Sequence, residues 1–148
     1  LQTMFIPALS IFMATAISGM LEGVGFWNDI RQLLERAKTR SDVFAANVGL
    51  AFLTGAVGCS QAIAVVMTHS IMRITYAQRG IQDEDVMLDF ENSGILIAPL
   101  QPWNIAAYVP IVMVGTSSTG YVPFAFFLYL VPLIYWLRLR KQDQPIIR

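Results

Sequence analysis

The sequence is poor in charged residues and in cysteine. Charged side chains make up 14% of the 148 residues, against about 25% in soluble domains, and the run Asn92–Leu137 contains none. A soluble domain of this size could not bury a chain that is 55% hydrophobic, so the composition favours a membrane protein. The net charge of zero gives no attraction to nucleic acid. The single cysteine, Cys59, excludes an internal disulfide.

The motifs of enzymes and cofactor sites are missing as well. The sequence has no Ser–His–Asp arrangement, no metal-ligand spacing and no phosphate-binding loop. Its glycine-rich stretches lie inside apolar runs, where they interrupt membrane helices. We therefore predict a protein that is not an enzyme and that holds neither a cofactor nor a resident metal.

The first forty residues predict two helices of different kinds. Leu1–Met20 is apolar and rich in small residues, as in a membrane helix that packs closely on its neighbours. Because no basic stretch precedes Leu1, it does not resemble a signal peptide, and we expect the chain to be a piece of a longer protein. Phe26–Lys38 is amphipathic with a tryptophan near its start, which favours a helix in the membrane interface. A helix packed on the soluble side remains the alternative.

A second uncharged run, Val43–Met72, is long for one membrane crossing and short for two. Small and polar residues lie near its middle. We predict two half-length helices that meet at this glycine-rich tip and form a re-entrant hairpin. A single tilted helix with a break is the alternative. These small and polar residues are Gly49, Thr54, Gly55, Gly58, Cys59, Ser60 and Gln61.

The long uncharged run divides at a turn over Gly115–Gly120 into Asn92–Val114 and Tyr121–Leu137. The first part contains Ala-Pro-Leu-Gln-Pro-Trp-Asn at residues 98–104. Backbone groups that proline leaves unpaired at membrane depth must find partners or line a cavity. The motif therefore predicts a broken helix of the kind that forms solute sites in secondary transporters.

Basic residues form two clusters, and such clusters mark cytoplasmic loops. Because Asn92–Val114 and Tyr121–Leu137 are two crossings, both clusters share a side only if Val43–Met72 makes no net crossing. This pattern favours the re-entrant hairpin. It predicts an integral protein of the plasma (inner) membrane whose basic loops and C-terminus are cytoplasmic. The clusters are Arg31, Arg36, Lys38, Arg40 and Arg138, Arg140, Lys141.

Three segments resemble the NhaC-type Na+/H+ antiporter family. Glu91–Asn104 (ENSGILIAPLQPWN) is similar to that family's E-D-x-G-T-V-T-S-P-L-I-P-W-N stretch. Gly58–Val66 resembles its G-S-Q-x-x-A-I-V block, and Tyr121–Phe127 together with Pro132 resembles the start and middle of its last helix. The similarity covers nearly the whole chain, and P-L-x-P-W-N is fairly specific.

The resemblance implies a fold and a function. The family belongs to the ion-transporter superfamily, whose members contain two inverted repeats, each with an entering helix, an interfacial helix, a re-entrant hairpin, a broken helix and a closing helix. Residues 1–148 would form the C-terminal repeat of such an all-α membrane protein, a sodium/proton antiporter. Its partners would be the lipid bilayer, the transported cation and proton, and the N-terminal repeat of the same polypeptide; a homodimer is left open.

The chain also departs from the family pattern. Ile95-Leu96-Ile97-Ala98 replaces the hydroxyl-rich T-V-T-S stretch, and Ile105 replaces a threonine. Gln101 replaces an isoleucine, and Asn92 replaces an acid. This loss of hydroxyl ligands leaves open a proton- or sodium-coupled transporter of organic ions such as amino acids or carboxylates. A noncatalytic membrane fragment is the third alternative.

The candidate ion-binding or substrate-binding residues supply oxygen near the hairpin tip and the break. A dehydrated cation needs several oxygen ligands, whereas an anion would meet the free N–H groups of helix N-termini. Asn104 could instead cap a helix. Ser60 and Gln61 could only bond neighbouring helices. The candidates are Thr54, Ser60, Gln61, Gln101 and Asn104.

Proton coupling requires a titratable group near the ion path. Glu91, at the mouth of the broken helix, and Glu22, at the end of the first helix, are the candidates in this chain. A carboxylate in a partly dry site can exchange a proton for a cation. Alternatively, both are interfacial carboxylates, and the main coupling group lies in the N-terminal repeat.

Overall fold

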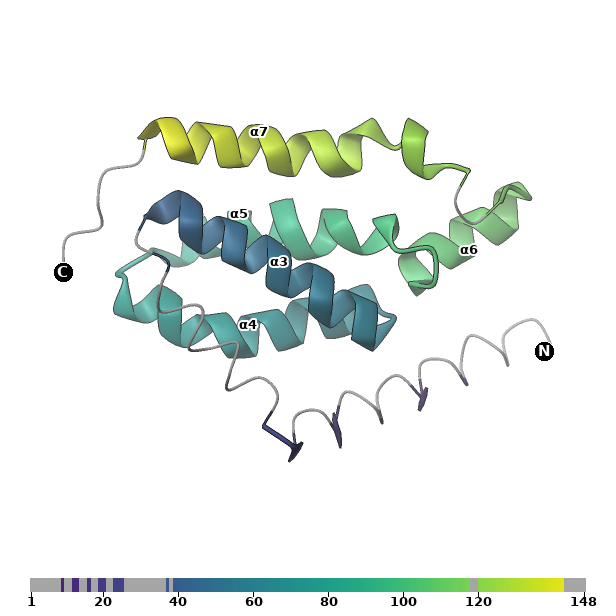
Figure 1. Cartoon of the computed structure of the whole chain (residues 1–148), viewed down its shortest axis with the longest axis horizontal. Helices are drawn as coiled ribbons and strands as arrows, with labels where there is room; N and C mark the ends of the chain where they lie inside the picture. Colours follow the sequence, from purple (N-terminus) through teal and green to yellow (C-terminus); the bar gives the residue numbers. More distant parts are fainter. Residues whose placement is uncertain are drawn as a thin grey trace.

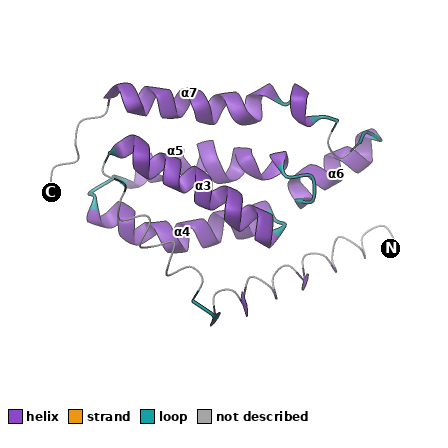
Figure 2. Cartoon of the chain, in the orientation of Figure 1, coloured by secondary structure: helices purple, strands orange, loops and turns teal. Residues whose placement is uncertain are grey.

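The computed structural model describes residues 39–117 and 120–142, together with isolated positions between 9 and 37. Every regular element in those ranges is helical (Figure 2), which confirms the prediction of an all-α chain. Glu22 and the predicted interfacial helix over Phe26–Lys38 lie outside the described residues, apart from Ala37. Most of the predicted helix over Leu1–Met20 lies outside them as well.

Two antiparallel helices form the predicted hairpin. Helix α3 spans Arg40–Gly58 and α4 spans Gln61–Gln78, with Cys59 and Ser60 as the turn. Their outer ends lie at the same end of the bundle (Figure 1), so the chain leaves the pair at the end where it entered. The helices have 19 and 18 residues, so the prediction of half-length helices was wrong, and a single broken helix is excluded.

Local sequence explains where α3 begins and ends. Thr39 and Asp42 form a reciprocal capping box, in which each side chain accepts a hydrogen bond from the other's backbone N–H. At the other end, Cys59 takes a left-handed conformation with φ of 50°, which reverses the chain. The hairpin packs around a core of apolar side chains that also includes Phe90: Val43, Leu50, Ile71, Met72 and Tyr76.

The next helical segment is broken, as predicted. Helix α5 (Asp83–Phe90) continues through a π-helical turn, η1 (Glu91–Ile95), and a 3-10 turn, η2 (Ala98–Leu100). Helix α6 (Ile105–Val114) follows after four residues, and the two arms are bent by 51°. Most of the charged stretch after Gln78 is helix α5. Three acids in the first turn of α5 favour this helix because they face its positive end.

Helix α7 closes the described chain. It spans Phe126–Gln142, follows the short turn η3 (Val122–Phe124), and lies along the edge of the bundle above α3 (Figure 1). Within the described ranges, α3 alone is long and apolar enough to cross a membrane as one helix. The bent pair of Asp83–Leu100 with α6 meets the same criteria together. These two segments position the candidate site.

Candidate functional site

The break begins where two prolines remove backbone donors. Pro99 has no N–H to offer the carbonyl of Ile95, four residues earlier. The side-chain amide of Gln61 replaces the missing backbone donor and donates to the carbonyl of Ile95 at 3.0 Å. The hydroxyl of Tyr121 donates to the carbonyl of Pro99. Two distant side chains therefore satisfy carbonyls that the break leaves exposed.

The break contacts the tip of the hairpin. The last carbonyls of a helix have no donor within that helix, and here the motif supplies donors to the end of α3. The side-chain nitrogens of Trp103 and Asn104 donate to Ala56 and Gly55 at 3.1 and 3.4 Å. The backbone N–H of Ile105 donates to the carbonyl of Cys59 at 3.0 Å.

Gln101 and Asn104 are buried at this junction, with 1% and 0% of their surface exposed. Gln101 donates to the carbonyl of Phe52 at 2.6 Å, and Gly55 gives it room, because a Cβ there would lie 3.1 Å from its Oε1. Asn104 caps α6, since its Oδ1 accepts from the N–H of Ala106 at 3.1 Å. The structure thus gives Asn104 the capping role named as its alternative.

Thr54 and Ser60 differ in how their hydroxyls are used. Thr54 is fully buried, and its hydroxyl lies 2.8 Å from that of Thr68, so the two share a hydrogen bond across the hairpin. Ser60 immediately precedes α4 and is half-buried. Its side chain forms no capping bond within the described part of the chain. Of the five predicted binding residues, Ser60 therefore has the hydroxyl that is least engaged.

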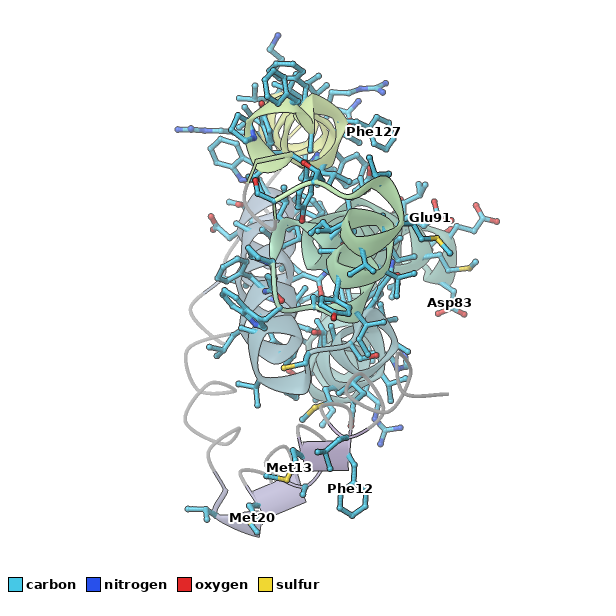
Figure 3. The ribbon with its side chains drawn as sticks, turned by 90° about the vertical axis from the view of Figure 1, so that its right-hand side faces the viewer. Phe12, Met13, Met20, Asp83, Glu91 and Phe127 are labelled. Atoms are coloured by element: carbon cyan, nitrogen blue, oxygen red, sulfur yellow. The ribbon has the colours of Figure 1, made fainter. Side chains whose placement is uncertain are left out.

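Glu91 lies away from the break. It precedes Gln101 by ten residues, or roughly 15 Å of helix, and its side chain is exposed. It lines a cavity of about 410 Å³ together with His69 and Asp83. Figure 3 shows Asp83 and Glu91 on the same outer flank of the bundle. The structure therefore brings Glu91 together with the only histidine, and not with the predicted binding residues.

A buried carboxylate that sequence reasoning missed holds four helices together. Asp89 is fully buried and accepts two hydrogen bonds from the guanidinium of Arg40, at 2.7 and 2.8 Å. The hydroxyls of Tyr76 and Tyr135 donate to it at 2.8 and 3.2 Å. These partners come from α3, α4 and α7, while Asp89 belongs to α5. The sequence showed only one acid among several in a charged stretch.

Asn47 and Ser93 form a second buried pair that the sequence did not reveal. The hydroxyl of Ser93 donates to the carbonyl of Asp89 at 2.6 Å and accepts from the amide nitrogen of Asn47 at 2.8 Å. Because the hydroxyl proton is already used, this pairing fixes the orientation of the Asn47 amide. Its Oδ1 is buried and has no hydrogen-bond partner among the described residues.

These polar contacts follow one face of α3. Arg40, Asn47 and Thr54 are spaced by seven residues, which places them on one side of a helix. We call them the polar seam. No cluster of three or more potential metal ligands occurs in the part of the chain that the structure describes. The seam therefore joins helices through hydrogen bonds and an ion pair.

Comparison with known proteins shows which family the sequence resembles. Residues 1–137 match a model of the Na+/H+ antiporter family. The chain is 30% identical over 142 residues to the Na(+)/H(+) antiporter NhaC of Bacillus subtilis (strain 168), which covers 90% of this chain and 30% of that protein. It is 24% identical over 139 residues to the Na(+)/H(+) antiporter NhaC of Alkalihalophilus pseudofirmus, covering 90% and 29%. The chain thus spans under a third of these relatives. No solved structure matches it.

Proposed function

Because this chain belongs to the Na+/H+ antiporter family, we propose that it forms the C-terminal repeat of a secondary transporter that exchanges sodium ions for protons. Membership of the family makes it part of an integral membrane protein. The cation would bind where the hairpin tip meets the break. The N-terminal repeat of the same polypeptide would complete the site, and a homodimer remains a prediction.

The bent segment seated on the hairpin tip is the observation that supports this proposal. The arms before and after the break differ in direction by 51°. The backbone at Gln101–Asn104, between η2 and α6, is not helical. The C-terminal ends of α3 and η2 both lie at this junction, and carbonyls at such ends coordinate cations in transporters. The hydroxyl of Ser60 lies at the tip as a further oxygen.

The occupied N-terminus of α6 favours a cation over an anion at the break. Its first four N–H groups donate to oxygens of Cys59 and Asn104, so none is left for a carboxylate. A second candidate cargo, an organic ion such as an amino acid or carboxylate, is favoured by α4 instead. That helix begins without a side-chain cap at Ser60. The loss of hydroxyls over Ile95–Ala98 supports the same alternative.

Glu91 is our candidate for proton coupling among the described residues, and Glu22, which lies outside them, is the second. Glu91 borders a cavity that His69 also lines, so the two titratable side chains share one space. The bilayer or the N-terminal repeat would face this cavity. In the proposed orientation, the basic residues at the end of α7 and Arg40 at the start of α3 lie on the cytoplasmic side.

Transport by the intact polypeptide tests the function. In proteoliposomes that contain a pH-sensitive dye, an inward sodium gradient should make the interior alkaline, whereas choline chloride should not. Ser60→Ala should raise the sodium concentration needed for half the maximal rate. Thr116→Val, which removes a hydroxyl at the far end of α6, is the matched control. Alkalinisation driven by an amino acid or a dicarboxylate, and not by sodium, would favour the second cargo.

A further inference from the structure

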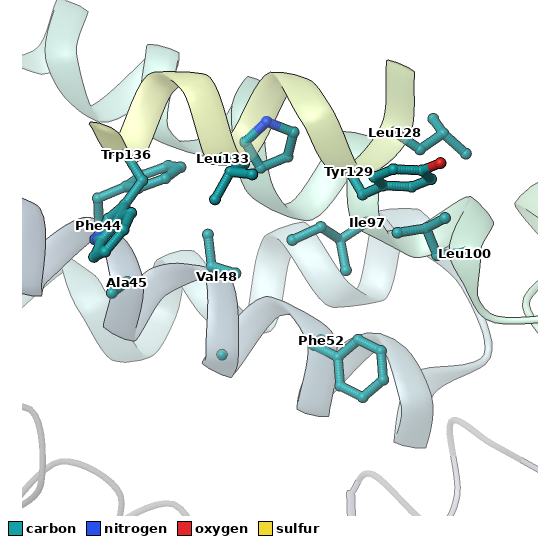
Figure 4. Close-up of a pocket in the computed structure, with 12 residues that line it drawn as sticks. Phe44, Ala45, Val48, Phe52, Ile97, Leu100, Leu128, Tyr129, Leu133 and Trp136 are labelled. Atoms are coloured by element: carbon teal, nitrogen blue, oxygen red, sulfur yellow. The ribbon is translucent and has the colours of Figure 1, made fainter. Parts of the chain in front are cut away.

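An apolar groove runs between α3 and α7. It has a volume of about 530 Å³ and is lined by apolar side chains of both helices, with Ile97 and Leu100 at its floor. Figure 4 shows side chains of α7 facing those of α3 across it. Phe52 and Leu133, on opposite walls, each keep 49% of their surface exposed, so the groove is open to the outside.

One end of the groove lies beside a contact between α7 and α3. There the ring of Tyr135 packs edge-on against Phe44 at 4.8 Å, and its hydroxyl reaches Asp89. Farther along, α3 presents Ala45 and Gly49 to the groove, which are too small to fill the space. A Cβ added at Gly49 would meet nothing within 4 Å. A space of this kind between membrane helices must be filled by something apolar.

Basic side chains gather at the end of the groove that Trp136 closes. The guanidinium of Arg140 lies 5.2 Å from the centre of the Trp136 ring, a cation–π contact. Arg138 and Lys141 are exposed in the same last turns of α7. Arg40 is not available to a ligand, because Asp89 already binds it. Arg140 follows Trp136 by four residues and continues the face of α7 that lines the groove, whereas Arg138 and Lys141 lie on other faces of that helix. The apolar groove thus ends beside one exposed positive charge.

We propose that this groove binds one acyl chain of an anionic phospholipid, with the lipid phosphate held by Arg140. The volume falls within the range of about 300–1,000 Å³ found for small-molecule sites. A lipid tail gains little by leaving other tails for an equally apolar groove. The headgroup charge therefore decides which lipid binds, and basic clusters beside membrane helices select anionic lipids.

Binding of two lipids with identical tails tests the proposal. The intact protein in a neutral detergent is titrated with palmitoyl-oleoyl phosphatidylglycerol or phosphatidylcholine, and bound lipid is counted by native mass spectrometry. The wild type should prefer phosphatidylglycerol. Arg140→Gln should weaken its binding about fivefold, whereas Arg138→Gln, on the opposite face of α7, should leave it unchanged. Arg73→Gln, an exposed charge on α4, should leave it unchanged.

Filling the groove tests the position of the tail. Gly49→Leu should abolish the preference for phosphatidylglycerol, whereas Val112→Leu on the exposed face of α6 should keep it. Equal binding of the two lipids by the wild type would overturn the proposal, as would wild-type binding by Gly49→Leu. A loss of thermal stability in Gly49→Leu without added lipid would also overturn it, since a protein segment would then occupy the groove. None of these outcomes depends on which ion is transported.

Discussion

The side-chain amide of Gln101 donates a hydrogen bond of 2.6 Å to the carbonyl of Phe52, which lies 49 residues earlier in the chain. This bond joins the break between η2 and α6 to helix α3 of the hairpin. Gln101 is buried, so its amide has no access to water as a substitute partner. The bond therefore fixes where the break sits.

Replacing Gln101 with methionine should destabilise the protein by about 1 kcal/mol, the usual net loss for one buried hydrogen bond. Methionine keeps the length of the side chain but cannot donate to Phe52. Thermal unfolding of the purified protein in detergent measures the change. Gln82→Met, at an exposed position before α5, is the matched control. Equal unfolding temperatures for the two variants would show that the bond contributes nothing.

Two glycines of α3 should respond in opposite ways to substitution by alanine. Gly55→Ala places a methyl group 3.1 Å from Gln101 Oε1 and should displace that side chain, lowering both stability and sodium affinity. Gly49→Ala meets open space and should stabilise the helix by about 0.5–1 kcal/mol. The two unfolding temperatures provide the comparison. Equal stability of Gly55→Ala and Gly49→Ala would contradict a close approach between Gly55 and the side chain of Gln101.

Asp89→Asn should destabilise the protein by about 3 kcal/mol, because it leaves the guanidinium of Arg40 without its charged partner. The Arg40 side chain is 16% exposed. We therefore expect a loss of stability at the lower end of the range found when one partner of a buried ion pair is removed. The double variant with Arg40→Gln should lose less than the two single variants together. Strict additivity would contradict a direct interaction between the two side chains.

Glu91→Gln should weaken proton-coupled transport without lowering stability. The side chain is exposed and borders a cavity, so the change should alter unfolding by no more than about 0.5 kcal/mol. The dependence of the transport rate on pH is the measurement, and it should flatten in the variant. Glu84→Gln, an exposed acid of α5, should keep the wild-type profile. An unchanged profile in Glu91→Gln would remove this carboxyl from the coupling.

The broken helix could be predicted because its cause is local. Pro99 and Pro102 interrupt an uncharged run, and their effect on the backbone needs no knowledge of distant residues. The hairpin tip was visible for the same reason, as a cluster of glycines between two apolar stretches. Both predictions depended on residues whose effect on the backbone is confined to about one helical turn.

The length of α5 and the role of Asp89 could not be predicted because their cause is distant. An acid inside a helix that borders the membrane is costly by itself, and Arg40, 49 residues away, removes that cost. The hydrogen bonds of the Gln101 and Asn104 amides could not be predicted either. They depend on where α3 lies relative to the break, because both amides donate to carbonyls of that helix.

The seven-residue spacing of the polar seam restricts the length of α3. Inserting or deleting one residue between Arg40 and Thr54 would rotate the later positions by about 100°. Asn47 or Thr54 would then turn away from Ser93 and Thr68, its partners across the bundle. We therefore expect this stretch to tolerate changes of side chain much better than changes of length.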